Sequence, residues 1–112
     1  AIANASFYDG GMAVSICEGQ NQDAQVINAQ VADELLNIKG IRASFVAGVN
    51  DKGITCISAR SLGDINVQVL LEKIGGGGHL NTAGAQVKEK PEEVLEIVLG
   101  LLEKGEKNES NT

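Results

Sequence analysis

The sequence predicts an α/β fold, with α+β as the alternative, in which about three helices pack on a mixed sheet of about five strands. Stretches with apolar residues at every second position alternate with stretches in which they recur every third or fourth position. Glycine, proline or asparagine lies at most of the boundaries between these stretches. The expected element order is therefore β-β-α-β-β-α-β-α.

The first third of the chain predicts a hairpin followed by a helix. Residues 1–8 and 11–17 are two strand-like runs on either side of Asp9-Gly10, a dipeptide that suits a tight turn. We expect Asp23 to be the N-cap of a helix that ends at Gly40. Its apolar positions follow helical spacing and are Ile27, Val31, Leu35 and Ile38.

The middle of the chain repeats this arrangement. Residues 41–49 and 54–60 have period-two, β-branched strand patterns, and the turn residues between them predict a second hairpin. Asp64 is expected to cap the next helix, and Gly75 to end it. One side of that helix carries the apolar residues Val67, Leu70, Leu71 and Ile74.

The last part of the chain predicts a short strand over residues 83–88 and a helix that begins at Pro91. The side of this helix expected to face the core carries Val94, Val98, Leu101 and Leu102. We assign residues 1–105 to one domain and residues 106–112 to a polar tail. A chain of 112 residues with 43% hydrophobic residues is long enough for one core.

Charge and aromatic content argue against binding of long nucleic acids. The chain has 9 Lys and Arg residues against 15 Asp and Glu residues, for a net charge of -6. Affinity for a long polyanion comes mostly from basic side chains that neutralise phosphates. The only aromatic residues are Phe7, Tyr8 and Phe45, too few for a base-stacking platform. A small anion held by a few directed groups fits this composition better.

The cysteines, the apolar runs and the first residue of the chain predict the redox state of the thiols, the absence of a membrane span and the origin of the chain. Cys17 and Cys56 lie in apolar runs without metal-ligand spacing, so we expect reduced thiols in the core. There is no apolar run long enough to cross a membrane and no signal-peptide pattern, so we expect this piece to be soluble. Because the sequence begins at Ala1 without Met, we expect an excised domain.

Four consecutive glycines precede the only histidine, His79. Gly75 alone can end a helix, and Gly76 can relax the turn that follows. Gly77 and Gly78 extend a run of bare backbone whose N–H groups can form a concavity for phosphate oxygens. The preceding helix turns the negative end of its dipole toward the run, so any anion must be held by the turn itself and by charge from other residues.

Arg60 and His79 are the candidate sources of that charge. Arginine can form a forked contact with phosphate, and histidine can supply a charge or a proton near neutral pH. The ends of a straight helix over residues 64–74 would lie about 15 Å apart, so the two residues meet only if the chain folds back or the ligand spans both, as a dinucleotide could. Arg60 also has a structural interpretation, as the partner of a surface carboxylate. Small polar residues nearby can donate to oxygens or serve as turn and cap residues: Ser58, Ser61, Asn81 and Thr82.

Together these residues resemble a known family. Residues 57–87, ISARSLGDINVQVLLEKIGGGGHLNTAGAQV, are similar to the core of the DHH-associated domain, the C-terminal half of DHH-family phosphoesterases. That core has a Ser-x-Arg-Ser strand end, an Asp-hydrophobic-Asn helix start and a Gly-Gly-Gly-Gly-His-x-x-Ala-Ala-Gly turn. Residues 30–49 also resemble the family. SLGDINVQV followed by GGGGHLNTAGAQ looks closest to membrane-associated bacterial cyclic-di-AMP phosphodiesterases, although Thr82 replaces a common alanine.

The resemblance implies the substrate-binding half of a phosphodiesterase that opens cyclic-di-AMP to a linear dinucleotide. Its metal ions, usually manganese, would be held by a preceding DHH domain, since this chain lacks an Asp-His-His motif. The fragment alone would then be inactive. By analogy, Arg60 and His79 are the catalytic residues and the backbone of residues 75–78 grips phosphate. The residues that would orient the nucleotide are Ser58, Ser61, Asn81 and Thr82. The resemblance further implies a cytoplasmic domain of a membrane-anchored parent and leaves a homodimer open.

Two other readings compete with this one. Another enzyme of the same family would be an oligoribonuclease, a 3',5'-bisphosphate nucleotide phosphatase or an exonuclease of the RecJ kind. A non-catalytic alternative is an RNA-binding module like the one at the end of alanyl-tRNA synthetases. The acidic charge disfavours both the exonuclease and the RNA module, because each needs a basic surface.

Overall fold

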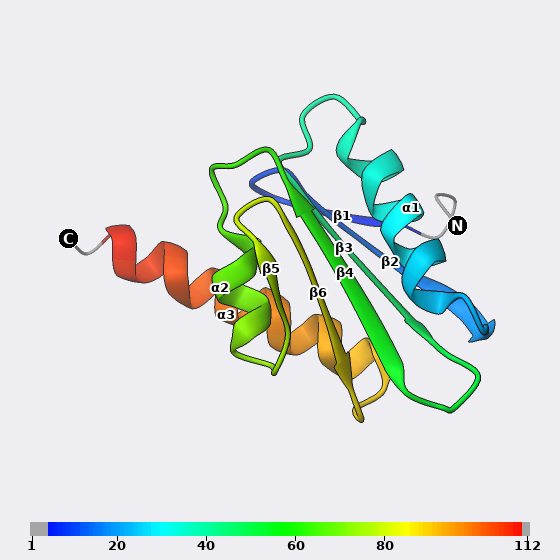
Figure 1. Cartoon of the computed structure of the whole chain (residues 1–112). Helices are drawn as coiled ribbons and strands as arrows, with labels where there is room; N and C mark the ends of the chain where they lie inside the picture. The colour runs from blue at the N-terminus through cyan, green and yellow to red at the C-terminus, as the bar shows by residue number, and fades with distance from the viewer. Residues whose placement is uncertain (1–4, 111–112) are drawn as a thin grey trace.

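A six-stranded mixed sheet with helices on both faces forms the fold (Figure 1). The computed structural model describes residues 5–110, and the side chains of residues 5–104. The strand order is β1-β2-β3-β4-β6-β5, and only β2 and β3 run parallel. The strands are β1 (Ser6–Tyr8), β2 (Met12–Gln20), β3 (Ala43–Val49), β4 (Thr55–Ser61), β5 (Gly77–His79) and β6 (Thr82–Val87). The helices are α1 (Ala24–Leu36), α2 (Val67–Glu72) and α3 (Pro91–Ser110).

The predicted α/β class is confirmed, and the strand count differs by one. The additional strand, β5, is formed by the glycine run, which was predicted to be a turn. Glycine has a low preference for strands, so the sequence pattern gave no strand signal there. Pairing with β6 in a hairpin overrides that preference, with His79 opposite Thr82 and Gly77 opposite Gly84.

The first hairpin and first helix form where expected, with local differences. Tyr8 pairs with Met12, and Gly10 and Gly11 in the turn between them have positive φ. Helix α1 then connects the two parallel strands, which need a crossover of this kind. Asp23 occupies the N-cap position, but its side chain makes no capping hydrogen bond. Ile38 falls outside the helix and is exposed, so its assignment to the helical apolar side was wrong.

Two apolar clusters lie on opposite faces of the sheet. Helix α1 covers one face, where Val31 and Leu35 pack against Val46 of β3. Helices α2 and α3 share the other face, where Leu71 and Val98 belong to the cluster that contains Phe45. Strand β3 is consequently buried on both sides, although its sequence alternates with period two. Helix α1 covers its face of the sheet only in part, and the candidate site lies on the part that it leaves open.

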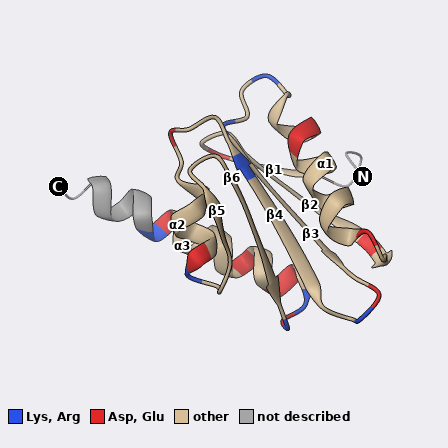
Figure 2. Ribbon diagram, in the orientation of Figure 1, with Lys and Arg blue, Asp and Glu red and all other residues tan. Residues whose placement is uncertain are grey.

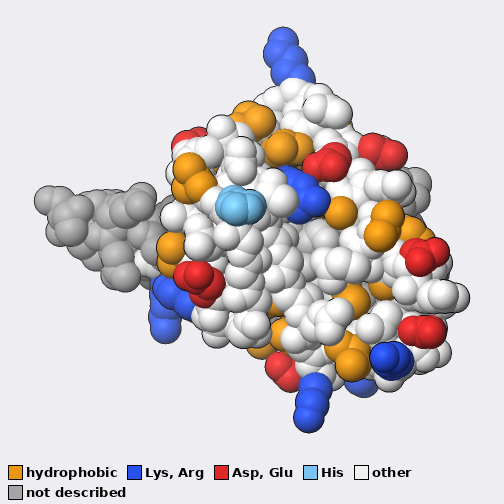
Figure 3. All heavy atoms as spheres, viewed as in Figure 1, with side chains coloured by type: hydrophobic (Ala, Val, Ile, Leu, Met, Phe, Trp, Pro, Cys, Tyr) orange, Lys and Arg blue, Asp and Glu red, His pale blue; other side chains and the backbone are white. Residues whose placement is uncertain are grey.

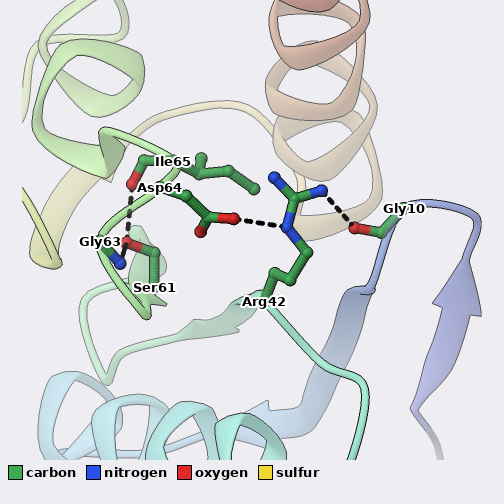
Figure 4. A network of polar contacts seen from close by, with 6 residues as sticks. All are labelled: Gly10, Arg42, Ser61, Gly63, Asp64 and Ile65. Carbon is green, nitrogen blue, oxygen red and sulfur yellow. Dashed lines mark hydrogen bonds and ion pairs between the residues drawn. The ribbon is translucent and has the colours of Figure 1, made fainter.

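The second helix begins later than predicted, because Asn66 and not Asp64 is its cap. The Asn66 side chain accepts a hydrogen bond from the backbone N–H of Val69, at 3.2 Å. The Asp64 carboxylate instead accepts from Nε of Arg42 at 2.6 Å, and Nη1 of Arg42 donates to the Gly10 carbonyl at 3.0 Å (Figure 4). Arg42 thus ties the first hairpin turn to the loop before α2, and α2 is shortened.

The C-terminal elements follow the sequence closely. Helix α3 begins at Pro91, and the predicted core positions Val94, Val98 and Leu102 are buried, whereas Leu101 is half-buried. The helix runs through Ser110, so it includes residues 106–110 of the segment assigned as a polar tail. Residues 111–112 of that segment lie outside the described residues.

Gly48 on β3 lies between Cys17 on β2 and Cys56 on β4, under Asn28 of α1. Both cysteines are free thiols, as predicted, and burial raises the pKa of each thiol. Asn28 is fully buried, and its Nδ2 donates to the Cys56 carbonyl at 2.9 Å. Its Oδ1 would lie 2.8 Å from a Cβ atom on Gly48. Only glycine therefore lets α1 approach the sheet this closely.

We predict that Gly48→Ala lowers the free energy of unfolding by about 1–3 kcal/mol, because the new methyl group would overlap Asn28. The matched control is Gly100→Ala on the exposed side of α3, where an added Cβ meets nothing within 4 Å. This control should raise the free energy of unfolding by roughly 0.5–1 kcal/mol, because alanine favours the helix. Urea unfolding measures both, and wild-type stability in Gly48→Ala would contradict the close approach of α1.

Candidate functional site

A shallow hollow lies on the sheet face that α1 only partly covers. Helix α1 packs on β2, β3 and β4, and the face of β6 and β5 beside it stays open. The hollow has a volume of about 280 Å³. Figure 3 shows the histidine and a basic side chain close together beside a white surface that is poor in coloured side chains. The lining residues are Gln25, Ala29, Ser58, Arg60, Gly77, Gly78, His79, Thr82, Ala83 and Gly84.

Strand pairing brings the two predicted catalytic residues together. Arg60 of β4 lies opposite Thr82 of β6, and Thr82 lies opposite His79 of β5. Two strand spacings, roughly 10 Å, therefore separate the backbones of Arg60 and His79. The chain folds back, one of the two possibilities considered from the sequence, because α2 is only six residues long and the chain returns through β5. The two side chains line opposite sides of one hollow.

The neighbouring row across the same strands forms the floor of the hollow. Ser58 of β4 lies opposite Gly84 of β6, which lies opposite Gly77 of β5. These residues are two positions along each strand from the row that contains Arg60, so they face the same side of the sheet. Because two of the three are glycines, the floor is largely bare backbone. A ligand can approach that backbone more closely than side chains would allow.

The four glycines have different roles. Gly75 has a φ of +90° and ends α2, and its N–H donates back to the carbonyl of Glu72. A Cβ on Gly76 would lie 2.3 Å from the Gly84 carbonyl oxygen, and one on Gly78 would lie 2.4 Å from that of Thr82. Gly77 has open space where its Cβ would be. The fold thus accounts for the other three, and Gly77 is the glycine whose missing side chain keeps the hollow open.

The predicted cradle of four N–H groups does not form. The N–H of Gly75 is used by α2, and the N–H of Gly76 donates to the Leu71 carbonyl at 2.8 Å. Neither of these two glycines lines the hollow. The part of the run that can contact a ligand is Gly77 and Gly78 together with His79.

Arg60 is held from two sides. Its Nε donates to Oδ1 of Asp33 on α1 at 2.9 Å, and its Nη1 donates to the Ala59 carbonyl at 2.9 Å. The Arg60 side chain is 15% exposed and that of Asp33 is 62% exposed. In Figure 2 the blue segment of β4 lies across from a red turn of α1. Arg60 therefore has both properties considered from the sequence, a carboxylate partner and a position in the candidate site.

The predicted polar residues divide between the hollow and the surrounding structure. The hydroxyl of Ser58 accepts from Nε2 of Gln25 at 3.1 Å, which leaves its own O–H to donate. The buried Ser61 donates to the Ile65 carbonyl at 2.6 Å and accepts from the N–H of Gly63, so its hydroxyl stabilises the loop before α2. Asn81 lies exposed in the β5–β6 turn, outside the lining, whereas Thr82 is part of it.

Helix α1 supplies residues that the sequence analysis missed. Gln25 and Ala29 line the hollow, and Asp33 contacts Arg60. Gln25, Ala29 and Asp33 follow one another at intervals of four positions, so they lie on one side of the helix. Small and polar residues at every fourth position are the signal in the sequence that could have indicated this side of the helix. The apolar residues on the other side of the same helix give a stronger pattern, so the prediction followed them. Ala83 and Gly84 of β6 were also missed.

The described side chains do not fit a metal centre. Among residues 5–104, no three His, Cys, Asp or Glu side chains lie together in an arrangement that could hold a metal ion. His79 is exposed at the edge strand. The described part of this chain therefore lacks the donor set that a di-metal phosphodiesterase needs.

The model of one protein family, the DHHA1 domain, matches residues 9–104. The chain belongs to the DHHA1 domain family. The matched region includes every strand except β1, and it contains the whole lining of the hollow.

Curated relatives of this DHHA1 domain include two named cyclic-di-AMP phosphodiesterases. PdeA of Listeria monocytogenes serotype 1/2a (strain 10403S) is 44% identical over 88 residues. GdpP of Geobacillus thermodenitrificans (strain NG80-2) is 46% identical over 88 residues. Each alignment covers 79% of the chain but only 13% of the relative, so the DHHA1 domain corresponds to a small part of each relative.

Two solved structures share the fold. An exopolyphosphatase-related protein from Bacteroides fragilis aligns with a TM-score of 0.75 and 24% identity over 91% of this chain and 32% of that one. The pGpG-specific phosphodiesterase PggH from Vibrio cholerae aligns with a TM-score of 0.57 and 16% identity, over 87% and 34% respectively. At these identities the likeness establishes the fold alone. Within the described residues, none of the helices combines the length and the apolar character that a membrane span requires.

We predict that alanine substitutions at adjacent glycines have opposite consequences for stability. Gly76→Ala should lower the free energy of unfolding by about 1–3 kcal/mol, because its Cβ would overlap the β6 backbone. Gly77→Ala should leave it unchanged or raise it by up to roughly 1 kcal/mol, since its Cβ points into open space. Urea unfolding of both variants gives the comparison. Equal losses would mean that the open side of Gly77 is closed in solution.

Proposed function

We propose that this DHHA1 domain is the substrate-binding half of a manganese-dependent DHH-family phosphodiesterase that hydrolyses cyclic-di-AMP to a linear dinucleotide. The observation that carries the proposal is the row of Arg60, Thr82 and His79 across three adjacent strands beside a glycine floor. A cationic group and an imidazole on opposite sides of bare backbone suit a phosphate group. The names of the curated relatives support cyclic-di-AMP as the substrate.

The hollow suggests how the phosphate is held. Arg60 would direct its remaining N–H groups at two phosphate oxygens, while His79 would donate from β5, on the far side of β6. Ser58 and Thr82 carry hydroxyls in the same lining and would donate to phosphate or sugar oxygens. Gly77 and Gly84 keep the floor clear for close approach. Charge that develops on the phosphate during hydrolysis would be stabilised by the same donors.

The hydrolytic half lies outside these residues in this proposal. The described side chains offer no metal site, so the manganese ions would be held by a DHH domain that precedes this one in the same parent chain. The nucleotide would lie between the two domains. The parent is proposed to place this domain in the cytoplasm and to be anchored in the membrane, and a homodimer stays open.

We predict that His79→Ala in the full-length protein lowers the turnover of cyclic-di-AMP on the order of 100-fold, because a directed donor is lost. Bound manganese should stay at the wild-type level, since the imidazole is not a ligand in this proposal. Turnover and metal content are measured on one sample. Arg60→Lys should also weaken turnover, because lysine keeps the charge but loses the fork, whereas the control Arg42→Lys should not.

The results for these variants distinguish a metal ligand, a wrong site and a wrong substrate. Loss of manganese in His79→Ala would make His79 a metal ligand. Wild-type turnover in both His79→Ala and Arg60→Lys would overturn the proposed site. Faster hydrolysis of a linear oligoribonucleotide or a 3',5'-bisphosphate nucleotide than of cyclic-di-AMP would keep the site and replace the substrate.

We also predict that the isolated 112-residue chain folds but does not hydrolyse cyclic-di-AMP in the presence of added manganese. The physical reason is the lack of a sufficient donor set among the described residues. Circular dichroism checks the fold, and chromatography of the nucleotide after incubation checks hydrolysis. Turnover by a preparation free of contaminating phosphodiesterase would place the reaction in this domain.

A further inference from the structure

We propose that Asp33 is a positioning residue that holds the Arg60 guanidinium in the orientation needed for phosphate. The inference rests on the proposed function, because it assigns Arg60 to the substrate. The sequence motifs point to Arg60 and the glycines and give Asp33 no role. The structure places Asp33 on α1, a different element from those that carry Arg60, His79 and Thr82.

The contacts of Arg60 leave one part of the guanidinium free. Asp33 engages Nε on one side, and the Ala59 carbonyl engages Nη1, each at 2.9 Å. A guanidinium carries more N–H groups than these two bonds use. Within the described residues, Nη2 makes no hydrogen bond, and Nη1 keeps its second hydrogen. Nη1 and Nη2 together form the end of the fork, which is the bidentate edge for a phosphate.

Helix α1 is fixed on the sheet, so Asp33 has a defined position relative to β4. The Ser44 hydroxyl of β3 donates to the Ala32 carbonyl, the residue just before Asp33, at 2.7 Å. One α1 side chain, Asn28, donates to the Cys56 carbonyl of β4, and another, Gln25, donates to Ser58. These bonds tie three successive turns of α1 to the sheet, so the carboxylate is presented by a rigid support.

Restraint of Arg60 before binding favours affinity. A free arginine side chain loses rotamer freedom when it grips a ligand, and this loss opposes binding. Asp33 and Ala59 impose most of that order in the free protein. The same contacts stabilise a cation that is mostly withdrawn from water, since its side chain is only 15% exposed.

Asp33 also has an electrostatic effect, which opposes phosphate binding. A carboxylate near the hollow repels a phosphate and offsets part of the Arg60 charge. Its 62% exposure favours screening by water, and it contacts Nε and not the free end of the fork. We therefore expect positioning to outweigh repulsion, which gives the experiment a definite sign.

The test is a double-mutant cycle on the full-length protein with cyclic-di-AMP as substrate. Asp33→Ala should raise KM roughly 2- to 10-fold, the effect of one rotamer-rich side chain left unrestrained, with a smaller change in kcat. Asp33→Asn keeps an acceptor for Nε and should restore part of the loss. When Arg60 is already alanine, Asp33→Ala should cause no further loss in kcat/KM. The matched control is Asp64→Ala, which breaks the Arg42 ion pair elsewhere and should leave KM unchanged.

The results distinguish this inference from the proposed function. If Arg60→Ala lowers kcat/KM but Asp33→Ala leaves KM unchanged or lowers it, Asp33 does not position Arg60. Additive losses in the double variant would likewise overturn the positioning role, because Asp33 would then act independently of Arg60. If Arg60→Ala itself has wild-type kcat/KM, the proposed function fails first. Unfolding midpoints of all variants show whether a change in KM accompanies a loss of the fold.

Discussion

Strand β5 lies against β6 through backbone that would collide with any side chain at Gly76 or Gly78, since added Cβ atoms would lie 2.3 and 2.4 Å from β6 carbonyl oxygens. This close approach folds the chain back after α2 and places His79 beside Thr82. The same pairing puts Gly77 opposite Gly84 and so makes the bare floor of the hollow. Without it, Arg60 and His79 would not line one hollow, and the candidate site would not exist.

The lining of the hollow contains one basic side chain, Arg60, within an acidic chain. The net charge is -6, and Figure 2 shows Lys and Arg scattered mainly over loops and helix ends rather than gathered in a stripe. Over the part of the chain that the structure describes, this distribution does not form the basic groove that a long polyanion or an RNA-binding module requires. One half-buried arginine, held by Asp33 and the Ala59 carbonyl, suits a small phosphate ligand better. Selectivity would then come from directed donors and not from the overall field.

The open form of the hollow fits a domain that shares its ligand with another domain. A volume of about 280 Å³ is at the lower end for a complete small-molecule pocket. Under the proposed function, it would take part of a nucleotide, and the rest would contact a second surface. Relatives several times longer than this chain are consistent with such a division, because the DHHA1 domain corresponds to only 13% of each.

Sequence periodicity and turn residues by themselves determined the α/β class, the β1–β2 and β3–β4 hairpins, α1 and α3, because these depend on local side-chain patterns. The motif residues likewise identified Arg60 and His79 before any geometry was known. Only tertiary structure decided that the glycine run is a strand, that Asn66 replaces Asp64 as a cap, and that Ser61 supports a loop. It also brought Asp33 and Gln25 to the hollow from α1. The physical reason is that strand pairing and helix placement join residues far apart in the chain, and no local pattern encodes which backbone will leave room for a Cβ atom.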